Sequence, residues 1–249
     1  MRVLLLNANT NLAMTEHCVA AARAYAPDID FVGATGRFGS PHIGTRATYA
    51  IAAHAALDAY AAQTERFDAV ILACFGDPGF AALKEIADGP VFALAESACR
   101  AAALSQKPFS VVTGGARWES MLREYLTPLG LTDYLASIRT VDVTGSQILA
   151  DPDRSIGKLA QACDAAARED GATRVILGGA GLIGLAPRVQ PNVSVQVLDC
   201  LIPAIDAARL AADVTPVPVS AVAAADAAGF PGLTPELAKR LAADIAKNL

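Results

Sequence analysis

Residues Phe67–Gly79 read FDAVILACFGDPG, and the expected fold is built outward from them. The run Ala69–Ala73 is apolar and rich in β-branched side chains, which predicts a strand buried on both faces of a parallel sheet. The strand ends at Cys74, where glycine and proline turn the chain. Asp77 is a suitable N-cap, and the proline after it fits the first turn of a helix that we expect to reach about Ala87.

Cys74 therefore lies at the C-terminal tip of a predicted strand, beside the start of a predicted helix. In open α/β sheets this edge is where ligands bind. A helix N-terminus also favours the thiolate form of cysteine over the thiol. A small buried cysteine that only packs is the alternative. The position favours a functional thiol, and Cys74 is our candidate catalytic residue.

A second stretch, Arg174–Gly184, repeats the pattern as RVILGGAGLIG. When Val70–Gly76 is set over Val175–Gly181, the apolar triplets and the last glycines match, and Cys74 falls on Gly179. Two further pairs of strand-like segments recur at a similar separation: Val3–Leu6 with Ser110–Thr113, and Val91–Leu94 with Val195–Leu198. Parallel strands also resemble one another without any repeat. We predict an α/β fold of two similar lobes with parallel sheets, related by a pseudo-twofold axis, with the active-site cleft between the lobes.

The rest of the chain alternates strand and helix patterns. Strands or extended segments are expected at residues 2–6, 31–33, 90–95, 109–113, 134–143 and 195–198, and helices at residues 12–25, 45–62, 96–104, 117–126, 151–169, 203–212 and 234–248. Residues 36–44 and 216–235 read as loops, the second with one short strand near Val217. We assign residues 1–96 and about 205–249 to the first lobe, and about 97–204 to the second.

Length and composition narrow the class of protein. A chain of 249 residues with 53% hydrophobic residues can bury a proper core and is not expected to be disordered. Its net charge is −5 with scattered Lys and Arg, so we expect neither a nucleic-acid nor a membrane partner. The N-terminal apolar run is too short for a signal peptide. The five cysteines and three histidines lack metal-ligand spacing, so we expect a cytoplasmic protein with free thiols and no metal site.

Several motifs together resemble those of the Asp/Glu/hydantoin racemase family. Asn7–Thr10 is similar to the family's Asn-Pro-Asn-Thr loop, and Ala73–Gly79 looks like its first cysteine motif. Val112–Thr113 resembles a strand end of the family, Gly178–Gly181 its second motif, normally Gly-Cys-Ala-Gly, and Val197–Asp199 the Val-Ile-Asp that follows. The resemblance covers residues 2 to about 210 in the expected order.

This resemblance implies two α/β lobes, no cofactor, and acid/base chemistry at a carbon next to a carbonyl. In the family one thiol takes the α-proton from one face of the substrate, and a second thiol returns a proton to the other face. Backbone N–H groups hold the carboxylate or imide oxygens and the enolate. The resemblance also implies a small-molecule substrate with a carboxylate or cyclic ureide, and a homo-oligomer. The residues expected to bind the substrate are Asn9, Thr10, Phe75, Gly76, Thr113, Gly114, Ala180 and Gly181.

The chain departs from the family at the second thiol. Cys74 matches the first thiol, but Gly179 stands where the second belongs and carries no acid or base. Cys200 follows the matched Asp199 on a neighbouring strand tip, from which it would have to reach the cleft. Three functions remain open. The chain is a racemase or epimerase with another second acid, a one-thiol enzyme similar to arylmalonate decarboxylase or maleate isomerase, or a non-catalytic binder of small carboxylates.

Substrate specificity is not read from the motifs. Arg46 is the one basic residue near the expected cleft that we consider as a partner for a substrate carboxylate. We expect the loop at residues 36–44 to be mobile and to decide the specificity. His42 in that loop is expected to be a loop or solvent residue rather than a base.

Overall fold

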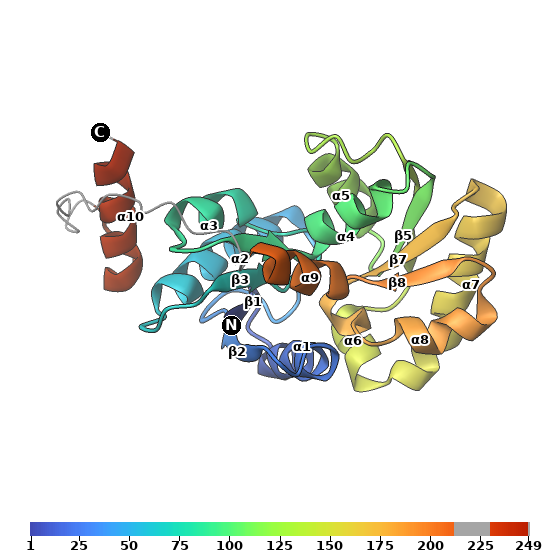
Figure 1. Cartoon of the computed structure of the whole chain (residues 1–249), viewed down its shortest axis with the longest axis horizontal. Helices are drawn as coiled ribbons and strands as arrows, with labels where there is room; N and C mark the ends of the chain where they lie inside the picture. The colour runs from blue at the N-terminus through green and yellow to red at the C-terminus, as the bar shows by residue number, and fades with distance from the viewer. Residues whose placement is uncertain (212–229, 249) are drawn as a thin grey trace.

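The computed structural model describes residues 1–211 and 230–248 of the chain. Two four-stranded parallel sheets form the two lobes, which lie side by side in Figure 1. This arrangement confirms the predicted α/β class and the two parallel sheets.

The first sheet contains β1 (Arg2–Asn7), β2 (Asp30–Thr35), β3 (Ala69–Leu72) and β4 (Val91–Ala93), in the order β2-β1-β3-β4. The side chains of β3 are all buried, and so are those of β1 after its first residue. Strands buried on both faces read as continuous apolar runs, which is why these two were recognisable. Leu6 pairs with Leu72, so β1 and β3 end level and their loops leave the same edge.

The second sheet contains β5 (Phe109–Gly114), β6 (Leu135–Val141), β7 (Arg174–Gly178) and β8 (Gln196–Asp199), in the order β6-β5-β7-β8. This is the order of the first sheet with each strand replaced by its counterpart in the repeat. The pairs of segments that the sequence matched lie on β1 and β5, β3 and β7, and β4 and β8. Cys74 and Gly179 therefore follow equivalent central strands.

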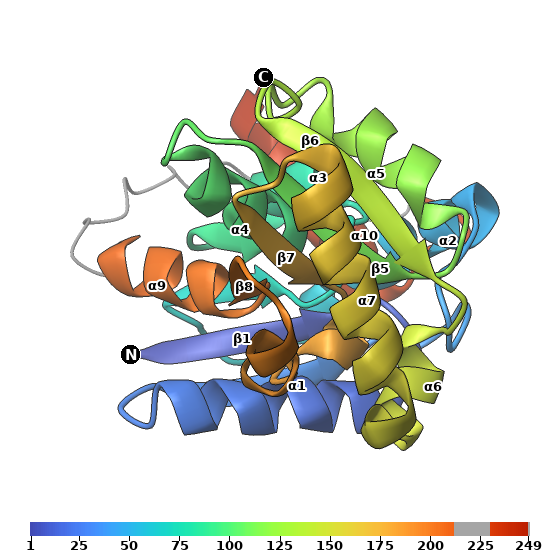
Figure 2. The same cartoon turned by 90° about the vertical axis from the view of Figure 1, so that its right-hand side faces the viewer.

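The helices cover the sheets and join the lobes. They are α1 (Leu12–Tyr25), α2 (Arg46–Ala61), α3 (Phe80–Ile86), α4 (Leu94–Ala103), α5 (Trp118–Leu126), α6 (Gly145–Ala150), α7 (Pro152–Asp170), α8 (Ala186–Val189), α9 (Ile202–Ala211) and α10 (Pro235–Asn248), with 3-10 turns η1 (Ala180–Leu182) and η2 (Gln190–Asn192). Figure 2 views the second lobe from outside, where α7 lies across its sheet. In Figure 1, α9 lies between the two lobes, where it contacts α4, β3 and β4.

A single hydrophobic core runs through both lobes. Leu4 of β1, Ile71 of β3, Phe109 of β5 and Ile176 of β7 belong to one cluster of buried side chains. A second, smaller cluster packs the other face of the second sheet against α7. The lobes are thus held together by apolar packing as well as by the chain itself.

The predicted elements agree with the structure except in a few places. The helix after the first cysteine motif begins at Phe80 instead of Pro78 and ends at Ile86. The short helices α6 and α8 and the 3-10 turns η1 and η2 were not predicted. The possible strand near Val217 lies outside the described residues. In the described part of the chain, no helix is long and apolar enough to cross a membrane.

Candidate active site

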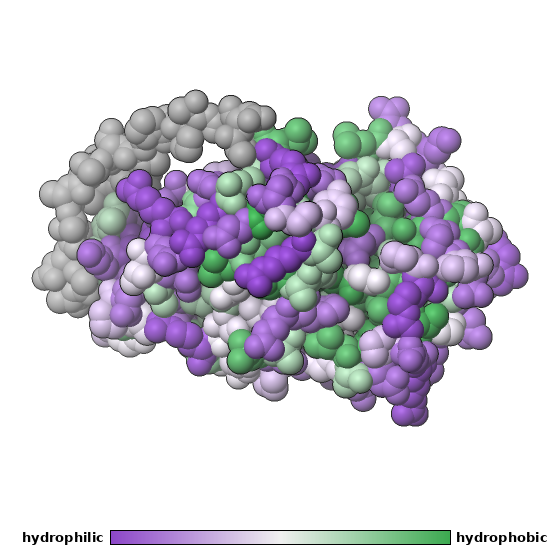
Figure 3. Space-filling model, turned by 60° about the horizontal axis from the view of Figure 1, so that its bottom comes forward, coloured by the Kyte–Doolittle hydropathy of each residue, from purple (hydrophilic) through white to green (hydrophobic). Residues whose placement is uncertain are grey.

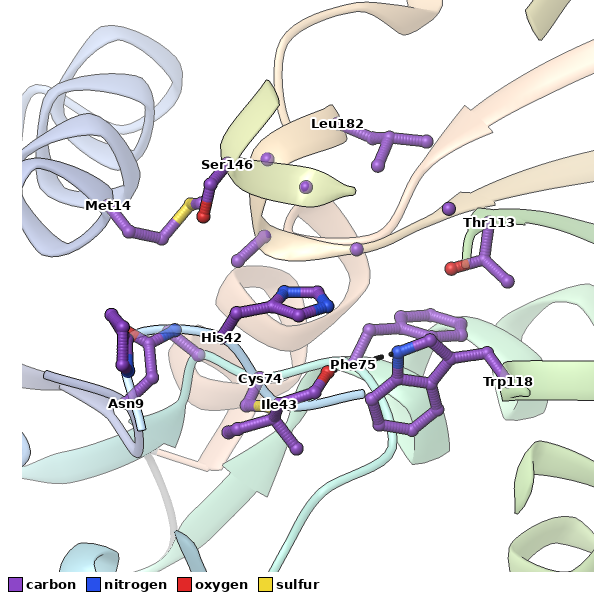
Figure 4. A pocket seen from close by; sticks show the side chains of 17 residues that line it. Asn9, Met14, His42, Ile43, Cys74, Phe75, Thr113, Trp118, Ser146 and Leu182 are labelled. Atoms are coloured by element: carbon purple, nitrogen blue, oxygen red, sulfur yellow. Dashed lines mark hydrogen bonds between the residues drawn. The ribbon is translucent and has the colours of Figure 1, made fainter. Parts of the chain in front are cut away.

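A cavity of about 70 Å³ lies between the lobes, at the tips of the central strands of both sheets (Figure 4). It is smaller than typical ligand pockets of about 300–1,000 Å³. A ligand larger than a small ring would therefore have to displace part of its wall. The described residues that line it are Asn9, Met14, Pro41, His42, Ile43, Ala73, Cys74, Phe75, Thr113, Gly114, Trp118, Gly145, Ser146, Gly179, Ala180, Gly181 and Leu182.

Cys74 lies directly after β3 and is only 7% exposed. Burial raises the pKa of its thiol, and nearby Asp77 and Cys18 raise it further. The sequence had predicted the opposite effect from an adjacent helix N-terminus. That prediction is wrong for this structure because α3 begins only at Phe80 and is not capped by a side chain. In the unliganded protein the thiol form of Cys74 dominates.

Asp77 was predicted to cap the helix that follows it, and this prediction is wrong. Its backbone adopts the left-handed conformation (φ 58°), which turns the side chain back into the protein. Its carboxylate instead accepts hydrogen bonds from the backbone N–H groups of Ala95 (2.9 Å) and Glu96 (2.8 Å), at the start of α4. It also accepts one from the Tyr125 hydroxyl (2.9 Å), which comes from α5 in the other lobe. Asp77 thus fixes the Cys74 loop to both lobes.

The loop after β1 is organised by Asn7, which is fully buried. Its side-chain amide donates to Oδ1 of Asn9 (2.9 Å) and to Thr15 Oγ1 (3.0 Å), and its own Oδ1 accepts from the Asn9 N–H (3.1 Å). Asn11 caps α1 by accepting from the Met14 N–H. Only Asn9 of these asparagines lines the cavity, and within the described structure its Nδ2 donor has no acceptor.

Gly179 follows β7 at the position equivalent to Cys74. Its φ of +153° and ψ of 139° lie in a region that residues with a β-carbon rarely adopt. A β-carbon there would lie 2.8 Å from Leu182 Cδ1 and 3.9 Å from the hydroxyl of Thr113. The loop is therefore shaped around a glycine, and the hydroxyl of Thr113 borders the space that a second thiol would enter.

Two aromatic rings close the cavity by packing on glycines of the opposite lobe. The ring of Trp118 lies against Gly76, where a β-carbon would approach it to 2.5 Å. The ring of Phe75 lies against Gly178 in the same way, also at 2.5 Å. Trp118 Nε1 donates to the carbonyl of Ile43 at 3.2 Å, shown by the dashed line in Figure 4. A β-carbon at Gly76 or Gly178 would collide with these rings, so the close packing of the rings favours glycine at both positions.

Cys200 lies beneath the second motif. It is fully buried and does not line the cavity, and its thiol donates to the carbonyl of Gly179 at 3.8 Å. Burial raises the pKa of this thiol well above its usual range, and Asp199 raises it further. The carboxylate of Asp199 is itself held by the N–H groups of Gly184 (2.5 Å) and Leu201 (2.8 Å). Both residues support the loop rather than face the cavity.

No Lys, Arg, Asp or Glu side chain is among the described residues that line the cavity. Arg46, considered above as a carboxylate partner, lies at the start of α2 outside the cavity. It forms a two-pronged ion pair across the lobes with Glu124, with Nε 3.0 Å from Oε2. Among the described lining residues only Cys74 and His42 have ionisable side chains, so no permanently charged side chain borders the cavity.

Backbone N–H groups are the main donors in the two strand-tip loops. Within the described residues, none accepts a hydrogen bond from the N–H of Phe75 or Gly76 after β3, or from that of Ala180 or Gly181 after β7. Such unpaired donors at the edge of a cavity can hold carbonyl oxygens and the negative charge of an enolate.

The structure brings most of the predicted site residues together. Those that line the cavity are Asn9, Cys74, Phe75, Thr113, Gly114, Gly179, Ala180 and Gly181. Thr10 and Gly76 do not line it: the Thr10 N–H donates to the carbonyl of Ser40 at 3.2 Å, and Gly76 packs on Trp118. Met14, His42, Trp118 and Ser146 line it without having been predicted, because they reach it through contacts between distant parts of the chain.

A larger hollow of about 630 Å³ lies elsewhere, between α1, α8 and β8. Figure 3 shows the side of the molecule that carries α1 and α8, with apolar residues gathered toward the second lobe. This hollow contains neither Cys74 nor the glycines of the second motif. The residues of the two matched motifs therefore assign the candidate site to the smaller cavity.

Comparisons with known proteins agree with these features. The family model described as Asp/Glu/Hydantoin racemase matches residues 3–208. A hydantoin racemase of Paenarthrobacter aurescens is 32% identical over 202 residues, which cover 80% of this chain and 86% of that protein. An allantoin racemase structure from Pseudomonas fluorescens superposes with a TM-score of 0.81 at 29% identity, covering 90% of this chain and 100% of the other.

Another allantoin racemase structure, from Klebsiella pneumoniae, is similar at 33% identity with a TM-score of 0.78, covering 85% of this chain and 87% of the other. Structures of arylmalonate decarboxylase and of a maleate isomerase from Nocardia farcinica share the fold at 17% and 13% identity, with TM-scores of 0.63 and 0.61. The arylmalonate decarboxylase comparison covers 86% of this chain and 94% of the other, and the maleate isomerase comparison covers 84% of this chain and 91% of the other.

Proposed function

Because the chain belongs to the Asp/Glu/hydantoin racemase family, we propose that it is a cofactor-independent racemase of 5-substituted hydantoins or allantoin. The observation that carries this proposal is a cavity between the lobes with Cys74 in its wall and no Lys, Arg, Asp or Glu side chain among the described residues that line it. The family supplies the reaction type, and the neutral cavity selects the substrate class.

The reaction needs a base beside the carbon that bears the exchangeable proton. In the proposed mechanism, the thiolate of Cys74 takes the proton from C5 of the ring, and the electron pair moves to the neighbouring carbonyl oxygen to form an enolate. The free N–H groups of Phe75 and Ala180 would hold the ring oxygens and this developing charge. Return of a proton to the opposite face of C5 completes the inversion.

The neutral lining favours a cyclic ureide over a free amino acid. An α-carboxylate entering this cavity would lose its water shell without meeting a Lys or Arg among the described lining residues, because Arg46 is paired with Glu124 outside it. A hydantoin ring is uncharged and offers carbonyl oxygens and N–H groups instead. Asn9 and Thr113 provide side-chain partners of matching polarity.

The same lining disfavours a one-thiol decarboxylase, because a malonate would bring two carboxylates into a cavity whose described lining contains no Lys or Arg. A one-face enzyme remains the second candidate, since Gly179 supplies no second thiol. A non-catalytic binder is the third. These alternatives differ from a racemase in whether the product is inverted, which chiral analysis detects directly.

The test is a chiral assay of the purified protein with single enantiomers of 5-methylhydantoin, 5-benzylhydantoin and allantoin, and with aspartate, glutamate and an aryl malonate for comparison. We expect inversion of at least one ureide and no turnover of the amino acids. The Cys74→Ser variant should lose at least about 100-fold in rate, the usual contribution of a positioned acid/base. The Cys163→Ala variant is the matched control, because Cys163 is a buried thiol of α7 that does not line the cavity.

Absence of inversion with every ureide would contradict the proposed activity. Decarboxylation of the malonate, or proton exchange without inversion, would instead assign a one-face enzyme. Ligand binding without any exchange would assign a binding protein.

We also propose that the protein forms a homo-oligomer. Leu104 and Leu210 are 84% and 74% exposed, and both border a hollow formed by α3, α4 and α9. Apolar side chains of this size gain from being covered by another molecule. Light scattering coupled to size-exclusion chromatography should give a mass of at least two chains, and a monomer at micromolar concentration would contradict the proposal.

A further inference from the structure

Inversion at C5 requires a second acid or base, and Gly179 does not supply one. Of the described residues that line the cavity, only Cys74 and His42 have side chains of a type that commonly serves as a general acid or base. The imidazole group is the side chain best suited to accept and donate a proton near neutral pH. One thiol and one imidazole thus share a single cavity, which makes His42 the candidate for the second acid or base.

The loop that carries His42 is anchored on both sides of the residue. The Ser40 hydroxyl donates to the carbonyl of His42 at 2.6 Å and accepts from its N–H at 3.2 Å. Ile43 is held through its carbonyl by Trp118 of the other lobe, and the Gly44 N–H donates to Thr48 Oγ1 at 3.1 Å. His42 is thus positioned by three independent contacts and is not a freely exposed loop residue as the sequence had suggested.

The imidazole ring is directed into the cavity. Figure 4 shows it in the interior, with Cys74 on one side in this view and Leu182 and Ser146 of the second lobe on the other. Neither ring nitrogen has a hydrogen-bond partner within the described residues. His42 is half-buried at the cavity wall, so its ring nitrogens are open to a bound ligand.

Glycine at position 44 makes room for this ring. A β-carbon on Gly44 would lie 2.8 Å from His42 Nε2, although the backbone at that position is compatible with other residues. The Gly44→Ala change would therefore turn the ring from its place without removing it. The chain thus offers a way to move the imidazole as well as to delete it.

Other candidates for the second group fit less well. Cys200 is fully buried, and its thiol donates to the Gly179 carbonyl instead of facing the cavity. Thr113 and Ser146 do line the cavity, but an alcohol is far too weak an acid to exchange a proton readily at neutral pH. His17 contacts the carbonyl of Ile183 at 3.1 Å and does not line the cavity.

We propose that His42 is the second catalytic acid/base, which serves the face of the substrate opposite to Cys74; this inference rests on the proposed racemase function. In one direction the Cys74 thiolate takes the C5 proton, the C–H electron pair moves into the enolate, and the His42 imidazolium gives its N–H proton to the other face of C5. In the reverse direction the neutral imidazole takes the proton and the Cys74 thiol returns one. No proton or electron is gained or lost over the exchange.

The experiment follows C5 proton exchange in D₂O from each enantiomer of 5-methylhydantoin separately, by NMR, with chiral analysis of the product. In the His42→Asn variant we expect at least a 100-fold loss of inversion, with exchange surviving in one enantiomer only. In the Cys74→Ser variant the surviving exchange should be in the opposite enantiomer. Gly44→Ala should reduce the rate from the same enantiomer as His42→Asn.

The matched controls are His54→Asn and Cys200→Ala. His54 is an exposed histidine of α2 outside the cavity, and its change should leave the rates from both enantiomers unaltered. Added imidazole should restore inversion to a His42→Ala variant, which a purely structural role would not allow. Circular dichroism confirms that each variant is folded before its rates are compared.

Wild-type inversion rates in His42→Asn would overturn the assignment while leaving the racemase function intact. Equal loss of exchange from both enantiomers would also overturn it, because it would make His42 a binding residue. Loss of inversion in Cys200→Ala with none in His42→Asn would transfer the role to Cys200. No exchange by the wild-type protein would remove the proposed function itself, and this inference with it.

Discussion

Asp77 is a single residue whose structural role could not be predicted from its neighbours in the sequence. Its neighbours in sequence, a proline and a glycine, indicated a local helix cap. In the structure its side chain instead accepts hydrogen bonds from two N–H groups of α4 and from the hydroxyl of Tyr125, which are distant from it in the sequence. No local pattern predicts such contacts, because they depend on how α4 and α5 pack beside the loop.

The buried carboxyl of Asp77 makes the protein less stable as pH rises. Burial raises its pKa to about 7 from 3.8, which outweighs its hydrogen bonds. Between about pH 4 and pH 7 the native protein retains a proton that the unfolded chain has lost, so the free energy of unfolding falls through this window. Asparagine does not titrate. The stability of the wild type relative to Asp77→Asn should therefore decline from pH 4 to pH 7 and level off above it.

Chemical unfolding of both proteins at several pH values measures this difference and cancels the titration of all other groups. A difference that is independent of pH, or that grows between pH 4 and pH 7, would show that the Asp77 carboxyl is charged throughout. Such a result would contradict the burial described here.

Gly179 offers a second test at this scale. We expect Gly179→Cys to cost about 1–3 kcal/mol of stability, because of its backbone conformation and the approach to Leu182. In the folded fraction the new thiol would border Thr113, where it can supply a proton to the substrate. The His42→Asn/Gly179→Cys double variant should therefore regain part of the inversion that His42→Asn loses. If it folds and regains none, Gly179 does not face the substrate.

At the scale of elements, the predictable parts are those defined by local patterns. The strands β1, β3, β5 and β7 are buried on both faces and read as apolar runs. The helix α1 has the predicted bounds because Asn11 caps it. The helix α6 was missed because it has only six residues, although its capping box of Thr144 and Gln147 was a usable signal.

The residues that close the cavity were the unpredictable part. Asn9, Cys74, Thr113 and the glycine-rich second motif follow strand tips, so they were found from the strand pattern. His42 and Trp118 come from a loop and from the start of α5, and their places depend on each other through a hydrogen bond between residues far apart in the chain. Short-range sequence patterns cannot predict this contact, because its two residues are 75 positions apart.

The contact between α5 and the His42 loop gives a prediction about an element. Trp118→Phe removes the Nε1 donor to Ile43 and also the outer indole atoms that lie against Gly76. We expect a loss of at least about 0.5–1.5 kcal/mol of stability, the usual net value of the hydrogen bond alone, and a raised KM because the loop is less firmly held. Urea unfolding followed by circular dichroism and steady-state kinetics measure both. An unchanged KM would show that the loop does not need this bond.

At the scale of the molecule, the two sheets share one strand order, and the cavity lies where their equivalent tips meet. The repeat in the sequence was sufficient to predict this because matched strands occupy matched places. The division into residues 1–96 with about 205–249, and about 97–204, stays a prediction. One hydrophobic core crosses both lobes, so the burial of apolar side chains in each lobe depends on the other.

The fit between lobes can be tested through Gly178, whose β-carbon would lie 2.5 Å from the ring of Phe75. Gly178→Ala should force the lobes apart, with a loss of about 1–3 kcal/mol of stability, as for other overpacked cores, and a lower racemisation rate. Gly157→Ala in α7 is the matched control, since nothing lies within 4 Å of its added carbon. That change should slightly stabilise the protein. Equal effects of the two substitutions would contradict the close packing between lobes.

The central claim is that a proton leaves one face of C5 and another returns to the opposite face, within this cavity. It is tested most directly by incubating one enantiomer of 5-methylhydantoin with the wild-type protein in D₂O and stopping the reaction early. We predict that the opposite enantiomer appears with deuterium at C5 while the remaining substrate still carries hydrogen. Deuterium in the remaining substrate, with none of the opposite enantiomer formed, would contradict the claim and show that only one face is served.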